Sequence, residues 1–207
     1  MIKTTWGYDL TEVNKIPDFL TVAEFNDFTN NKFSGMTDTR VLSNIPSATR
    51  AIQNYCGWHI YPNLECSASF RVLDLRDYFV GPDLLIQLPA TMVNSIKSLK
   101  IDGTDITDYE LEGCGLLRIY DCGWFDRRTK LTVVYDAGVD ESQMDLIKEL
   151  AANRVVHAVS SSYGVMSEAA GGVSVTYNAA WAGKTSSTAL ADDNKEILEP
   201  FKVKGVF

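Results

Sequence analysis

The chain has 207 residues, of which 45% are hydrophobic and 11% aromatic, and its 27 acidic and 19 basic side chains give a formal net charge of -8. This composition excludes a disordered protein, and a chain of this length can bury roughly 70% of its unfolded surface in a core. No apolar run approaches the ~18 residues of a membrane span, so we expect a protein that stays in the cytoplasm where it is made and has no membrane partner. The acidic balance also argues against a surface built to grip nucleic acid.

The N-terminal residues 1–20 mix aromatic, polar and proline residues without any period, which predicts an arm that lies on another surface. A short helix is expected next, because Thr21 and Glu24 have the spacing of a capping box, in which each side chain binds the other residue's backbone amide. Val22, Phe25 and Phe28 would then share one face of that helix.

A second helix is predicted between Thr39 and Gly57, because its apolar residues recur at helical spacing. Pro46 lies inside this pattern, so the helix either restarts there or kinks. Gly57 is a natural C-terminal stop. The stripe consists of Val41, Ile45, Ala48, Ile52 and Tyr55.

A β region follows from Trp58 to Asp136, where the period changes to two and turn residues are frequent. Apolar residues alternate with polar ones from Cys66 to Val72, and the dipeptide Asp102-Gly103 is a favoured hairpin turn. No helical stretch separates the five or six expected strands, so the sheet should be antiparallel. The other candidate strands are Leu84–Leu88, Leu99–Ile101, Tyr109–Leu111, Leu116–Tyr120 and Leu131–Tyr135.

Helical spacing returns from Glu141 to Tyr163, with Asp140 as a plausible cap. A Gly-, Ser- and Ala-rich stretch then encloses an alternating run, which predicts a tethered strand or hairpin in a long loop. A short helix stopped by Pro200 precedes an aromatic and basic tail. The helical stripe comprises Met144, Ile147, Ala151, Val155 and Ala158, widened by Leu150 and Val159, and the alternating run is Val173–Tyr177.

These elements predict an α+β fold: a small helical bundle with a long central helix, an inserted antiparallel β subdomain, and a tethered strand or hairpin loop. We expect an N-terminal arm and one domain. The arm covers 1–20 and the domain 21–207, with helical parts 21–58, 138–163 and 189–207, the β insertion 59–137 and the extended loop 164–188.

The residues offer little catalytic or metal chemistry. His59 and His157 are the two histidines, and neither has a carboxylate at local spacing. The four cysteines form no CxxC pair and are expected to be small buried or half-buried thiols. Nucleophile-elbow, phosphate-loop and zinc-protease motifs do not occur in the sequence. We therefore predict no catalytic residue, no cofactor, no metal site and no enzymatic activity. The cysteines are Cys56, Cys66, Cys114 and Cys122.

Two charged clusters have alternative interpretations. Asp102, Asp105 and Asp108 recur every third residue, but a calcium loop needs alternate ligands and a central glycine, so a solvated turn is favoured. The Asp126–Arg128 cluster beside two aromatic residues is either a charged hairpin tip, which is favoured, or a site for phosphate or a neighbour's carboxylate.

Four motifs occur in a characteristic order. They are the helix-ending run Ala48–Gly57, the strand Thr132–Gly138 before the long helix, the tethered strand made of Ser167-Glu168 and then Gly172–Tyr177, and the terminal run Ile197–Lys202. In this order, over Thr21 to Lys202, the chain resembles the head–tail connector proteins of tailed bacteriophages, also called adaptor or head completion proteins.

The resemblance implies a structural virion protein at the head–tail junction that forms a ring, expected to be twelve-fold. It implies contacts with the portal protein above and a stopper or tail protein below, and DNA would pass through the channel without specific binding. The acidic balance is compatible with this role, since negative subunits around a channel would repel phosphates. A virion-associated β-rich module that recognises carbohydrate or protein is the alternative.

Two sets of residues follow from the connector hypothesis. The C-terminal segment would bind the portal, and the tethered strand would add to a neighbouring subunit's sheet edge. The portal-binding candidates are Ile197, Leu198, Pro200, Phe201, Lys202 and Phe207, and the inter-subunit strand candidates are Val173, Val175 and Tyr177.

Overall fold

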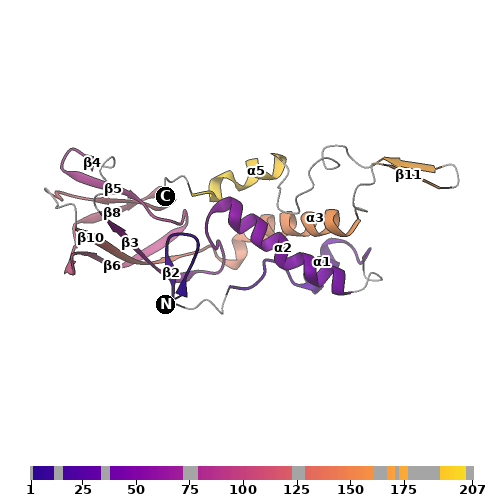
Figure 1. Ribbon diagram of the computed structural model, residues 1–207, viewed down its shortest axis with the longest axis horizontal. Helices are drawn as coiled ribbons and strands as arrows, with labels where there is room; N and C mark the ends of the chain where they lie inside the picture. Colours follow the sequence, from indigo (N-terminus) through magenta and orange to yellow (C-terminus); the bar gives the residue numbers. More distant parts are fainter. Residues whose placement is uncertain are drawn as a thin grey trace. The chain divides into compact units, whose positions relative to one another are not determined.

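The structure, a computed structural model, combines helices with antiparallel sheets, which confirms the α+β class (Figure 1). It describes residues 2–11, 16–33, 38–71, 79–122, 129–160, 167–170, 173–176 and 192–203. The chain divides into two compact units. Unit 1 comprises Met1–Pro17, Gln53–Gln143 and Leu198–Phe207, and unit 2 comprises Asp18–Ile52 and Met144–Ile197.

Unit 1 contains two antiparallel sheets, where the sequence predicted one. The six-stranded sheet has the order β1-β2-β3-β10-β6-β7 and the four-stranded sheet the order β4-β5-β9-β8. The strands of the first sheet are β1 (Ile2–Lys3), β2 (Asp9–Leu10), β3 (Leu64–Arg71), β10 (Lys130–Ala137), β6 (Val93–Ile101) and β7 (Thr104–Asp105). Those of the second are β4 (Phe79–Val80), β5 (Asp83–Gln87), β9 (Leu116–Ile119) and β8 (Tyr109–Glu112), with a 3-10 turn, η3 (Gly113–Gly115), before β9.

Each sheet has one buried face, because apolar and polar residues alternate along its strands. Figure 1 shows β5 and β8 on one side of the unit and β3, β6 and β10 on the other. The core between them is built from alternate residues of both sheets. The buried residues include Ala68, Leu131, Val133 and Tyr135 of the larger sheet and Leu84, Ile86, Leu117 and Ile119 of the smaller one.

The predicted turn at Asp102-Gly103 is confirmed. It joins β6 to β7, with Ile101 and Thr104 as direct partners. Asp102 has φ 48° and Gly103 has φ 86°, so both central residues adopt the left-handed conformation of a type I′ hairpin turn. Aspartate and glycine tolerate this conformation better than other residues, which is why the dipeptide signals the turn in the sequence.

The N-terminal segment, predicted as an arm, lies against the chain's own sheet in its first part. β1 and β2 form a hairpin, and β2 pairs with β3 through Asp9–Ser67 and Leu10–Cys66. Tyr8 and Leu10 are buried. Strands of two residues are too short to show a period, so sequence patterns gave no signal for this hairpin.

Unit 2 begins with α1 (Val22–Phe28), and its predicted capping box is confirmed. The Thr21 hydroxyl accepts from the Glu24 amide at 3.2 Å, and the Glu24 carboxylate accepts from the Thr21 amide at 2.8 Å. Phe25 is buried as expected, whereas Phe28 is 45% exposed. The Glu24 carboxylate also forms an ion pair with Lys148 of α3 at 2.7 Å.

Helix α2 (Asp38–Cys56) contains Pro46 within one continuous helix. The predicted stripe is confirmed for the four residues that are buried, and Tyr55 at its end is half-buried. Gly57 follows the helix with φ +81°, a conformation suited to a helix C-terminus, and its amide donates to the Gln53 carbonyl at 2.8 Å. The buried residues of the stripe are Val41, Ile45, Ala48 and Ile52.

Helix α3 (Asp145–Ser160) is shorter than the predicted helix, which began at Glu141. A 3-10 turn, η4 (Glu141–Gln143), comes first and is closed by a bond from the Gln143 amide to the Asp140 carbonyl. The helix spans 16 residues, or about 24 Å. Six of the predicted stripe residues are buried and Ala158 is exposed. The residues after Ser160 up to Tyr163 lie outside the described part of the chain.

The tethered segment forms an antiparallel hairpin of β11 (Ser167–Ala170) and β12 (Val173–Thr176). The terminal helix is α5 (Asp192–Leu198), followed by a 3-10 turn, η5 (Glu199–Phe201), that contains Pro200. No helix in the ranges given above has the length and apolar character needed to cross a membrane.

Candidate docking site at the C-terminal segment

The C-terminal segment, defined as Glu199–Val203, lies against the residues that follow α2 within unit 1. The Val203 amide donates to the Cys56 carbonyl at 2.9 Å. The Phe201 carbonyl accepts from two side chains, the Trp58 indole and the Thr91 hydroxyl. Trp58 is fully buried, so its N–H needs a partner inside the protein. The segment is therefore fixed by backbone contacts that do not depend on its side chains.

Three side chains at the edge of this contact carry charge or can carry it. The Tyr55 hydroxyl donates to the Glu199 carboxylate at 3.1 Å, and the Lys202 ammonium lies 4.9 Å from the centre of the Tyr55 ring. Lys202 also lies 3.7 Å from Glu199. Burial and the neighbouring Glu199 carboxylate raise the pKa of Tyr55, so the phenol stays protonated. Exposed pairs of this kind contribute little stability, up to about 1 kcal/mol each.

The residues predicted to bind the portal differ in accessibility. Leu198 is fully buried, so it belongs to the protein's own core. Ile197 is 36% exposed and Pro200 is exposed, whereas Phe201 and Lys202 are half-buried. Phe207 lies outside the described residues. Ile197 precedes this segment, and the surface that a partner can reach on the segment itself is formed by Pro200 with the outer parts of Phe201 and Lys202.

A buried hydrogen-bond network surrounds His59, whose ring meets the Trp58 ring edge-on with centroids 5.5 Å apart. The Tyr8 hydroxyl donates to His59 Nδ1 at 2.7 Å and accepts from the His59 amide at 3.1 Å. Nε2 lies 3.0 Å from both the Pro62 and Ala137 carbonyls, which only accept, so Nε2 carries the proton. The Gln53 side chain donates to the His59 carbonyl at 3.1 Å.

His59 is completely buried, and this burial lowers its pKa to about 4. The imidazole is therefore neutral at neutral pH. It joins the N-terminal hairpin, the exit of α2 and the end of β10 without reaching the surface. This arrangement is that of a structural histidine.

The other sequence candidates are not brought together. His157 is exposed on α3. The Asp102 carboxylate accepts from the Lys130 amide at 2.7 Å, Asp105 pairs with Lys100 at 3.3 Å, and Asp108 is exposed, as expected of turn residues. Within the described ranges, no group of three His, Cys, Asp or Glu side chains is arranged to hold a metal ion. The Asp126–Arg128 cluster lies outside those ranges.

The four cysteines are free thiols that differ in exposure. Cys56 and Cys66 are buried, Cys122 is half-buried and Cys114 is exposed. Burial is the main cause that raises the pKa of both Cys56 and Cys66 to about 12, which makes them unreactive as thiolates. The expectation of buried or half-buried thiols is wrong for Cys114, which sits at the left-handed position of η3 and points outward.

The inter-subunit strand candidates lie in an isolated hairpin. In β12, Val173 pairs with Ala170 and Val175 pairs with Glu168 of β11. In the described part of the chain, these two strands pair only with each other. Tyr177 lies outside it.

Residues 18–201 match the head completion protein family. The chain belongs to this family. The match spans most of the chain, so this head completion protein is a structural component of the phage virion that associates with other virion proteins. No curated protein matches the chain.

The match begins at Asp18, where unit 2 begins, and ends at Phe201, within the C-terminal segment. The β1–β2 hairpin therefore lies outside the family match, although it completes the larger sheet of this head completion protein. No sequence pattern indicates that Tyr55, Trp58 and Thr91 are the partners of the C-terminal segment. The one available signal is the position of a large aromatic residue directly after the Gly57 helix stop.

Proposed function

We propose that this head completion protein is a head–tail connector subunit that assembles into a ring, expected to be twelve-fold, beneath the portal. It joins the portal to a stopper or tail protein and lets DNA pass. In the proposal, α1, α2 and α3 form a helical bundle in each subunit of the ring. The protein has a structural role and no catalytic activity.

The observation that carries the proposal is the isolated hairpin β11–β12. A two-stranded hairpin is at best marginally stable alone in water, and its unpaired edges are templates for another strand. Both edges of this hairpin lack a partner among the described strands. Pairing with the sheet edge of a neighbouring subunit would satisfy those backbone groups and repeat around a closed ring.

The accessible surface of the C-terminal segment supports the portal contact. Pro200 offers apolar surface on a segment whose backbone is already fixed, so docking there would cost little conformational entropy. Ile197, just before the segment, is 36% exposed and adds apolar surface. The excess of 27 acidic over 19 basic side chains supports passage of DNA without binding, because a net negative subunit repels phosphates.

The test is electron microscopy and native mass of the purified protein, alone and with its portal. Rings, or portal-bound rings, are expected. A protein that stays monomeric and does not bind the portal would contradict the proposal. The alternative, a β-rich module that recognises carbohydrate, predicts instead that glycans bind in a soaking or array experiment.

A further inference from the structure

We propose that a basic corner of unit 1, defined as Arg71 and Lys130, binds the carboxylates of Asp145 and Glu149 on α3 of a second copy of this chain. The inference rests on the proposed ring, for which it supplies one contact between neighbouring subunits.

The basic corner places two positive charges side by side at one end of the larger sheet. β3 ends at Arg71, β10 begins at Lys130, and the two residues are direct partners in the strand register. Both are exposed, and directly opposite residues have Cβ atoms about 4.5–5.5 Å apart, a spacing at which like charges repel. A hollow of about 300 Å³ lies beside them, lined by these two residues with Ser69 and Phe70.

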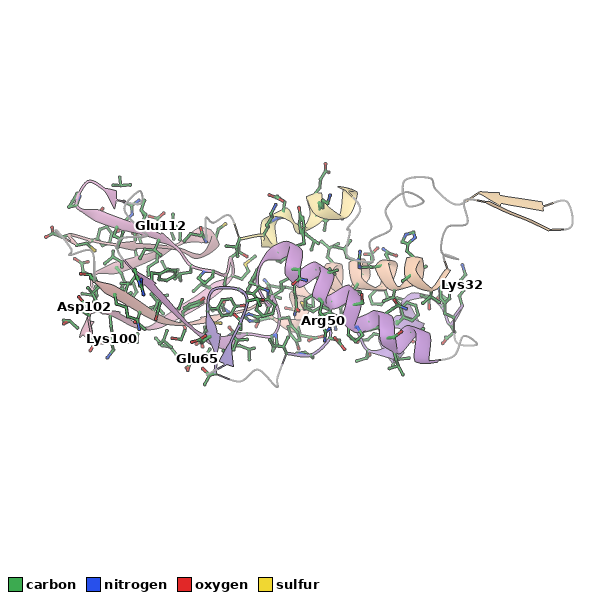
Figure 2. The ribbon with its side chains drawn as sticks, in the orientation of Figure 1. Lys32, Arg50, Glu65, Lys100, Asp102 and Glu112 are labelled. Carbon is green, nitrogen blue, oxygen red and sulfur yellow. The ribbon has the colours of Figure 1, made fainter. Side chains whose placement is uncertain are left out.

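Two other basic side chains of the same sheet, both on β6, form ion pairs within the chain. Lys97 lies 2.8 Å from each of two carboxylates, and Lys100 lies 3.3 Å from one. Among the described residues, no carboxylate forms an ion pair with Arg71 or Lys130. Asp102, which Figure 2 shows with Lys100 at this end of the sheet, binds the backbone amide of Lys130 at 2.7 Å rather than its ammonium group.

A complementary acidic pair lies on α3. Asp145 and Glu149 are both exposed and are four residues apart, so their side chains are neighbours on the helix surface about 5–6 Å apart. The nearby Lys148 directs its ammonium group to Glu24, at 2.7 Å. In the described part of the chain, no basic side chain forms an ion pair with Asp145 or Glu149. Among the described residues, each of these like-charged pairs, one positive and one negative, is thus without an ion-pair partner. Lys32 lines the same hollow as Glu149 but forms no ion pair with it.

The occupant is a second copy because the chain carries both halves of the contact. The acidic pair matches the basic corner in spacing and is opposite in sign. Since the two pairs lie on different parts of the surface, the contact is head-to-tail, and a repeated head-to-tail contact closes into a ring or grows as a filament.

The test compares self-association of the full chain, by sedimentation and native mass, at about 50 mM salt and again at high salt, with and without portal. Arg71→Glu with Lys130→Glu is expected to weaken association about tenfold or more per contact. Adding Asp145→Lys and Glu149→Lys to the same chain is expected to restore it. The matched control Lys100→Glu reverses one exposed lysine of the same sheet and is expected to weaken association less than Lys130→Glu does.

Folding is checked by thermal unfolding, where Arg71→Gln should be neutral or slightly stabilising because it removes a like-charge repulsion. If the wild type assembles and the Arg71/Lys130 reversal assembles equally well, the inference is overturned and the proposed ring stands. Failure of the four-residue exchange to restore assembly also overturns it. The inference is also overturned if Arg71→Glu with Lys130→Glu weakens only the binding of duplex DNA and leaves self-association unchanged. A wild type that never associates, with or without portal, overturns both proposals.

Discussion

The buried His59 predicts how the stability of unit 1 depends on pH. Its pKa is lowered by burial to about 4 in the folded protein, against 6.5 for an unperturbed histidine. As the pH falls below 6.5, the unfolded chain binds a proton that the folded chain cannot accept. Stability is therefore lost between pH 6.5 and 4, and this contribution becomes constant below pH 4.

The size of the loss follows from the two pKa values. One pKa unit corresponds to about 1.4 kcal/mol, so His59 costs about 3 kcal/mol over its whole titration. Most of this cost falls above pH 4.5. Paired carboxylates lose their contribution to stability below that pH. Glu24 is an example, because its hydrogen bond to Lys148 is the main cause that lowers its pKa to about 2. The window from pH 6.5 to 4.5 therefore isolates the histidine.

The assay is urea unfolding of the wild type and of His59→Gln at half-unit pH steps, followed by circular dichroism and tryptophan fluorescence. Glutamine keeps an N–H donor for the two carbonyls and does not titrate. The wild type is expected to lose about 2–3 kcal/mol relative to the variant between pH 6.5 and 4.5. Parallel curves for the two proteins across this window would refute the buried neutral histidine.

Three further outcomes follow from local geometry. Gly115→Ala should destabilise the protein by more than about 1 kcal/mol in a urea titration, because Gly115 has φ +73° and a Cβ there would collide with a main-chain oxygen. The control Gly113→Ala should be near neutral in the same titration, because the space around Gly113 is open. Thr21→Ala should cost about 1 kcal/mol, measured by thermal unfolding, because it removes the cap of α1. Leu198→Ala should cost about 2–5 kcal/mol because the side chain is fully buried. Ile197→Asp should cost less, about 1 kcal/mol, because Ile197 is already 36% exposed, and it should weaken portal binding. Equal stability losses for Leu198→Ala and Ile197→Asp would contradict this division.

Local patterns predicted the elements whose signal is contained in a short stretch of chain. The α2 stripe, the Thr21 capping box and the Asp102-Gly103 turn each depend on residues within one or a few turns of one another, so periodicity and turn chemistry were sufficient. The predicted helix begins earlier than α3, because Glu141 fits a helical pattern equally well in the 3-10 turn that the structure has there.

Features that depend on distant residues could not be predicted in this way. The Tyr8–His59 bond joins residues 51 apart in the sequence, and the split of the β region into two sheets depends on which strands meet. Burial of Leu198 likewise has no local signal, since an amphipathic terminal helix has the same pattern whether its apolar face meets its own chain or a partner. Sequence patterns therefore predict which segment forms the candidate site. Only the structure shows which of its residues are accessible to a partner.

The contact between Trp58 and the Phe201 carbonyl also sets an order of events during synthesis. The two residues are 143 positions apart, so the indole N–H is translated long before its acceptor exists. Until then the residues that follow α2 lack their contacts with the C-terminal segment. Unit 1 therefore cannot reach its final packing before the residues after Leu198 have been made. A nascent chain consequently has the residues that hold the C-terminal segment but lacks the segment itself. Any partner that recognises the finished segment would discriminate against incomplete chains, so that truncated subunits would be kept out of the particle.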